Sequence, residues 1–112
     1  MISNARITGW RMATGATAAG VPTFADQVIA SPAPALHSGL TLQQQAMLAT
    51  TSIQATGTVI HQVDRTGAPN VAVGDRIQLD RSVDWLDVVS LGATVKGAVS
   101  HRLLYVKKPG TP

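Results

Sequence analysis

The stretch VGDRIQLDRSVDWLDVVSL, residues 73–91, decides the fold that this sequence predicts. Apolar and polar residues alternate in its first half, with Ile77 and Leu79 set between Arg76, Gln78 and Asp80. Such alternation indicates a strand with one buried face and one face in water. Residues 81–84 form a polar link, and residues 85–91 form a second, more apolar run. We therefore predict a β-hairpin whose charges keep its outer face wet, rather than an acid–base site.

Two further strands are predicted upstream of this hairpin. Residues 5–13 form the first, with Trp10 and Met12 on one face and Ile7 on the other. The second covers residues 26–31 and is expected to stop at the prolines that follow, because proline cannot donate to a β-ladder.

LTLQQQAMLAT, residues 40–50, predicts the one helix. Thr41 can cap its first turn, and Gln44 three positions later completes a capping box. A helix of about three turns is marginal in isolation, so we expect this one to need a neighbouring surface.

Two strands remain. Residues 52–63 alternate in polarity and place His61 in an apolar row, where we expect a hydrogen-bonded histidine of the interior. Residues 64–74 contain several turn-forming residues and predict a loop, and residues 99–108 predict the last strand. The fold class is therefore mainly β: a small antiparallel β-barrel or sandwich of five to six strands, with one short α-helix and long loops.

At 112 residues the chain fits a single domain. We expect residues 1–112 to form one β-barrel domain. Within it, residues 31–52 are expected to project as a loop and helix, and residues 107–112 to form a basic, flexible tail.

The sequence offers little chemistry. The absence of cysteine excludes disulfides, thiolate metal sites and thiol nucleophiles. The three histidines, His37, His61 and His101, stand in separate segments without the spacing of metal ligands. Neither a nucleophile-elbow motif nor a phosphate-loop motif is present. We expect no catalytic residue, no metal, no cofactor and no enzymatic activity.

Nine Lys and Arg against six Asp give a net charge of +3, which tolerates nucleic acid nearby without demanding it. Four basic residues are candidates for contacts to DNA or a partner and are otherwise solvated charges: Arg65, Arg102, Lys107 and Lys108. No run of apolar residues reaches the length of roughly 18 that a membrane span requires, so we expect no membrane partner.

Two strands carry apolar residues on both faces, more than one short helix can cover. The surplus either meets another subunit or lies in the core of the domain itself. The candidates for this interface are Leu86, Val88, Leu104 and Val106.

From residue 24 onward, the order of features resembles the head-closure (stopper, or head–tail joining) proteins of long-tailed bacteriophages. The segments that carry the resemblance are SPAPALHSGLTLQQQAMLATT, IQATGTVIHQV, VGDRIQLD, DWLDVVSL and SHRLLYVKK. Two departures stand out. The hairpin turn at residues 80–84 lacks the glycine that the family often has, and the helix carries Gln43, Gln44 and Gln45 where the family is often acidic.

The resemblance implies a structural virion protein of the phage neck, made in the host cytoplasm. Its partners would be copies of itself in a ring, a portal or adaptor protein, tail proteins, and packaged double-stranded DNA in the channel. It further implies that residues 38–52 project into that channel and close it. The gate candidates are Ser38, Thr41, Gln43, Gln44, Gln45, Thr50 and Thr51.

Two alternatives remain open. One is another virion part of similar build, a tail-completion or head-decoration protein. The other is a small OB-like nucleic-acid-binding protein, in which Trp10 or Trp85 would stack on bases.

Overall fold

The computed structural model describes residues 4–29, 32–63, 68–95 and 100–108, with the backbone alone for residues 93–95. These ranges hold seven strands and one helix. Their bounds are β1 Ala5–Ala16, β2 Pro22–Gln27, β3 Ala33–Ser38, α1 Leu42–Ala49, β4 Gly57–Gln62, β5 Arg76–Leu79, β6 Trp85–Val95 and β7 His101–Lys107.

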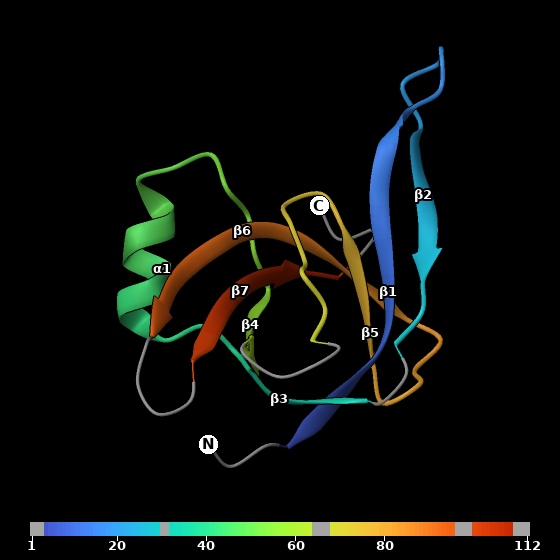
Figure 1. Ribbon diagram of the computed structural model, residues 1–112. Coiled ribbons are helices and arrows are strands. Elements are labelled where there is room, and N and C mark those ends of the chain that lie inside the picture. Colours follow the sequence, from blue (N-terminus) through green and yellow to red (C-terminus); the bar gives the residue numbers. More distant parts are fainter. Residues whose placement is uncertain (1–3, 30–31, 64–67, 96–99, 109–112) are drawn as a thin grey trace.

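The strands form one antiparallel sheet in the order β2-β1-β3-β4-β7-β6-β5, and an additional pairing of β1 with β5 closes it. Six strands thus make a barrel, and β2 extends it beside β1 (Figure 1). Closure pairs the edges that an open sheet would leave free. The mainly-β prediction is confirmed, and of the two architectures considered the chain adopts the barrel.

The length of β1 lets it serve three neighbours. Its start pairs with β3, its middle with β5 and its far end with β2. The pairing with β5 shifts register between Ile7 and Gly9. Such a bulge reverses which face the following side chains occupy. Ile7 and Trp10 therefore both contact the core, and the expectation that they lie on opposite faces is wrong.

β5 and β6 form the predicted hairpin, with Ile77 opposite Leu86 and with Ile77 and Leu79 buried. Its turn contains no glycine, yet Asp80 and Arg81 have φ of 52° and 55°. The N–H of Ser82 donates to the carbonyl of Leu79 at 2.9 Å. Two central residues with positive φ are typical of the type I′ turn, whose twist matches that of paired strands.

Replacing Arg81 with glycine is expected to stabilise the protein by about 0.5–1 kcal/mol. The substitution creates Asp-Gly, the pair that type I′ turns favour, and removes the steric cost of positive φ at a side chain that is exposed. Urea denaturation measures the difference. Ser82→Gly is the matched control and should not stabilise, since no positive φ is present at that residue.

The core lies inside the barrel and contains Val88, Leu104 and Val106, with Leu86 packed against them. Of the two interpretations that the sequence left open, the core therefore holds for Val88, Leu104 and Val106, whereas Leu86 is half-buried. Closure of the sheet turns their face inward, where the opposite wall of the barrel covers it.

β3 occupies residues 33–38 and lies between β1 and β4, so this part of the segment 31–52 does not project. Proline is tolerated in it because pairing with β4 begins only at Ala35, after Pro34. The preceding strand, predicted at residues 26–31, is observed as β2 at Pro22–Gln27.

The helix prediction is confirmed in its detail. Thr41 is the N-cap of α1, and its hydroxyl accepts from the N–H of Gln44 at 3.1 Å. The side chain of Gln44 in turn accepts from the N–H of Thr41 at 2.9 Å.

Candidate functional site

Two parts of the chain stand off the barrel. The first is the helix–loop segment, residues 39–56, which contains α1. The second is the arm, residues 12–22, which is the far end of the β1–β2 hairpin and is exposed along its whole length. In Figure 1 α1 lies at the left of the barrel and the tip of the arm at the upper right.

α1 makes little contact with the barrel. Among the described residues, no Cα atom of α1 comes within 8 Å of a Cα atom in a strand. Leu48 is its one buried side chain, whereas Leu42 is 84% exposed and Met47 is 50% exposed. The helix therefore presents apolar side chains that its own domain does not cover.

An open hollow of about 470 Å³ lies between α1, the residues that follow it and the end of β7. Leu40, Leu48, Ile53 and neutral polar side chains line it, and Lys107 is the one charged residue among the described residues of its lining. A hollow with this lining suits a neutral protein segment better than a polyanion, for which one lysine is insufficient.

Most gate candidates are engaged in holding the helix–loop segment together. Thr41 and Gln44 form the capping box, and the side-chain amide of Gln45 donates to the carbonyl of Leu40 at 3.3 Å. The hydroxyls of Thr50 and Thr51 donate to the carbonyls of Met47 and Leu48 at 2.8 and 2.9 Å.

Two gate candidates differ from these. Ser38 belongs to β3, and its hydroxyl lies 3.2 Å from that of Thr58 on β4. Gln43 is exposed on α1 without a hydrogen-bond partner among the described residues. Of the candidates on the helix, Gln43 has the side chain most available to an outside molecule.

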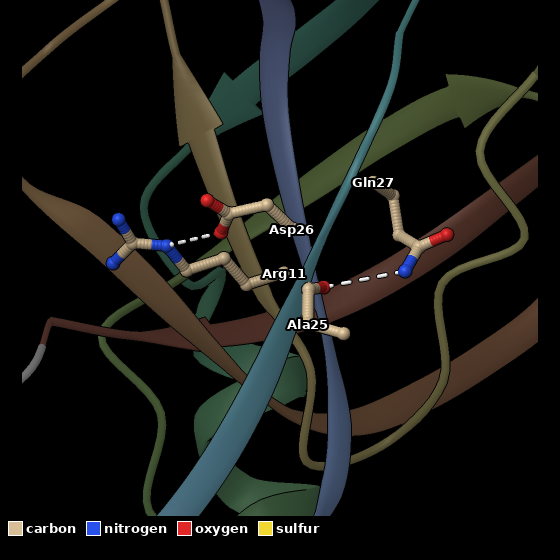
Figure 2. Close-up of polar contacts among 4 residues, drawn as sticks. All are labelled: Arg11, Ala25, Asp26 and Gln27. Atoms are coloured by element: carbon tan, nitrogen blue, oxygen red, sulfur yellow. Dashed lines mark hydrogen bonds and ion pairs between the residues drawn. The ribbon is translucent and has the colours of Figure 1, made fainter.

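The arm is neutral. No charged residue occurs between Arg11 and Asp26. Its turn is closed by the N–H of Gly20, which donates to the carbonyl of Thr17 at 2.9 Å, with Gly20 at φ 81°. At its base, Figure 2 shows Arg11 on β1 paired with Asp26 on β2, with Nε and Oδ1 2.9 Å apart. The side-chain amide of Gln27 donates to the carbonyl of Ala25 beside this pair.

A row of charges crosses the outer face of four adjacent strands. In register it runs Asp26, Arg11, Arg76 and Asp87, so that each guanidinium has a carboxylate neighbour. Arg76 Nε and Asp87 Oδ1 are 2.8 Å apart. Arg11 also stacks on Trp85 at 4.1 Å, and Arg76 on Phe24 at 4.5 Å. The charges of the row compensate one another, and the ring of Trp85 already has a partner.

Asp75 has a structural role that the sequence did not reveal. It is 2% exposed and accepts three hydrogen bonds, each at 2.9 Å. The donors are the indole of Trp10 and the N–H groups of Ala13 and Ala72. One carboxylate thus joins the loop before β5 to β1 at the base of the arm. The role could not be predicted because Gly-Asp is common in loops that lead into strands.

One pocket, of about 290 Å³, brings together His37, Ser82, Asp84 and Lys108. The hydroxyl of Ser82 accepts from the N–H of Asp84 at 3.2 Å, and no hydrogen bond joins either residue to His37 within the described part of the chain. This grouping lacks the nucleophile–base hydrogen bond of a catalytic triad. Nor do three or more His, Cys, Asp or Glu side chains gather as a metal site among the described residues.

His61 lies inside the barrel with no exposed surface, as its apolar row predicts. Its Nδ1 is 3.3 Å from the carbonyl of Gln62, and its Nε2 has no hydrogen-bond partner in the part of the chain that the structure describes. Desolvation by burial is the main cause that lowers the pKa of His61 from an ordinary 6.5 to about 4, and the charge of Arg102 acts in the same direction.

The predicted DNA or partner contacts separate in space. Arg65 lies outside the described residues. Arg102 is half-buried and shares a face of β7 with Leu104, and its Nη1 donates to the carbonyl of Val71 at 3.1 Å, so its guanidinium already has a partner within the domain. Lys107 ends β7 and Lys108 is exposed, with its N–H bonded to Thr56. Lys107 is thus part of the barrel rather than of a tail, and residues 109–112 lie outside the described range.

No helix in the described ranges is long and apolar enough to cross a membrane. Comparison with known proteins gave no match to a family model, a curated protein or a solved structure.

Proposed function

We propose that this protein is a non-enzymatic, structural component of a phage neck. In this role copies of the chain form a ring between the portal or its adaptor and the tail. The helix–loop segment closes the DNA channel, and the outer surface of the ring receives the tail.

The observation that carries the proposal is a helix–loop segment that is locally complete but not packed on its barrel. Its caps and threonines satisfy its own backbone, while Leu42 and Met47 remain exposed. A helix of this length is marginal without a neighbouring surface. Neighbouring copies in a ring would supply that surface.

The arm offers the second contact for a ring. It is neutral and carries exposed Met12 and Val21, and in the view of Figure 1 it points away from α1. If the arm of one copy contacts the helix–loop segment of the next, the contact is head-to-tail. Such contacts form a closed ring when the rotation from one copy to the next adds up to a full turn. In this proposal, a contact between the arm of one copy and the helix–loop segment of the next takes the place of the subunit interface that the sequence suggested on β6 and β7.

The amides of α1 suit a channel plug. Gln43 and Gln45 are exposed and neutral, so they neither bind phosphates strongly nor repel them. DNA held behind such a plug would be retained by steric closure and could pass once the plug moves.

Replacing Gln43 and Gln45 with alanine is expected to leave the thermal unfolding midpoint within about 2 °C of the wild type, because surface substitutions on a helix change little. Particles assembled with the variant should lose packaged DNA, because the plug is smaller. The measurement is the amount of DNase-protected DNA in purified heads.

Gln44→Ala is the matched control. It removes half of the capping box and should lower helix stability by about 1 kcal/mol without shortening the exposed side chains beside it. Heads that retain their DNA with the double variant would exclude the plug. A micromolar affinity of the isolated protein for single-stranded DNA would instead favour the nucleic-acid binder.

A further inference from the structure

At the end of the barrel where β4 ends and β7 begins, two basic side chains are cross-strand neighbours. His61 on β4 and Arg102 on β7 are cross-strand partners. They continue the inward rows that begin with Val59 and Leu104, both fully buried. Cross-strand partners on one face place their Cβ atoms about 5 Å apart. The neutral imidazole of His61 therefore lies beside the guanidinium of Arg102, and the imidazole is not exposed to water.

The loop before β5 covers this end of the barrel. Pro69 and Val71 are buried, and Val71 belongs to the hydrophobic core. The guanidinium of Arg102 holds that loop through the carbonyl of Val71. Farther along, the loop is anchored a second time, where the N–H of Ala72 donates to Asp75. Arg102 thus holds Val71, and Asp75 holds the residue that follows it.

Among the described residues, the carbonyl of Gln62 favours the protonated form of His61, but no carboxylate acts on it. On β3 its partner is Ala35, which contributes only a methyl group. On β7 the groups that act on it are Arg102 and His101, and both oppose protonation. Among the described residues the Nε2 atom has no acceptor, so a proton there would be buried without a hydrogen bond to any of them.

We propose that His61, Arg102 and the loop residues 68–71 form an acid-sensitive latch. When His61 takes up a proton, two cations stand side by side at the end of the core. Their repulsion and the need to hydrate the imidazolium move Val71 and its neighbours out of the barrel end, while the strands stay paired. The latch is independent of the neck function proposed above.

The sign of the effect follows from linkage. An exposed His61 in the open state takes up a proton below its ordinary pKa of 6.5, whereas the buried one does so only near 4. Protons therefore favour the open state as the pH falls from 6.5 to 4, and the preference stops growing below that. Between about pH 7.5 and pH 4.5 the opening constant should rise roughly 70-fold.

Relaxation-dispersion NMR of the wild-type protein tests the latch. The open population reported by the amides of Asn70 and Val71 should rise over this pH range, while the amides of Ile7 and Ile77 stay unchanged. His61→Gln should remove the pH dependence, and His37→Gln, a change at an exposed histidine, should preserve it. The ring signal of His61 should titrate well below 6.5.

The ring titration keeps the test decisive if His61→Gln does not fold, because it needs no variant. A His61 ring that titrates near 6.5 overturns the latch. So does loop opening that persists unchanged in a folded His61→Gln protein, or global unfolding in acid without earlier opening of the loop. Loss of neck function in any variant leaves these readouts unaffected.

Discussion

Leu104→Arg is expected to unfold the protein, with a loss of at least about 4–5 kcal/mol. Leu104 is fully buried in the centre of β7 and belongs to a core cluster of apolar side chains. An unpaired buried charge is among the most costly single changes, and a domain of this size has only about 5–15 kcal/mol in total. Circular dichroism of the purified variant measures the loss.

Val83→Arg is the matched control, because Val83 is 92% exposed and the same side chain enters water there. It should leave the unfolding transition unchanged. The pair also decides between the two interpretations of the apolar rows that the sequence left open. A folded Leu104→Arg protein that fails only to assemble would restore the interface interpretation and contradict the burial described above.

Asp75→Ala is expected to lower the free energy of unfolding by about 3 kcal/mol. It removes one carboxylate that accepts three hydrogen bonds and leaves the indole of Trp10 without its acceptor at a partly buried site. Hydrogen bonds to charged groups are the stronger ones, and stranding a buried donor adds its desolvation penalty. Urea denaturation followed by tryptophan fluorescence gives the value.

Asp84→Ala is the control for this change. Asp84 is exposed and its carboxylate has no hydrogen-bond partner among the described residues, so its loss should stay within about 0.5 kcal/mol. Equal effects of the two substitutions would show that Asp75 is an ordinary surface charge. Asp75→Asn should fall between them, because an amide oxygen can accept but its nitrogen cannot.

Several local features could be predicted because they depend on residues close in the chain. The capping box joins Thr41 to Gln44, three residues apart. The hairpin of β5 and β6 follows from the alternation at Arg76–Leu79 and a short polar link. In each case the interacting residues are close in the chain and follow the regular spacing of a helix or a strand, so the sequence alone is enough to predict the feature.

The candidate site could be predicted only in outline. The neutral helix–loop segment was identified from its composition, but the arm was not recognised as a projection, and β3 was assigned to the loop because of its prolines. Asp75 was not singled out from the sequence, which contains only a common Gly-Asp pair at this position. Its burial depends on Trp10 and Ala13, more than sixty residues away in the chain.

By itself, the sequence determined the strand periods, the helix with its cap and the neutral character of residues 12–25. Only the tertiary structure decided that the sheet closes, through the pairing of β1 with β5, and which apolar face lies inside. An alternating pattern indicates that a strand has an apolar face, but it does not indicate which part of the molecule covers that face. In this chain the opposite wall of the barrel covers that face, and the bulge near Gly9 turns Trp10 toward it.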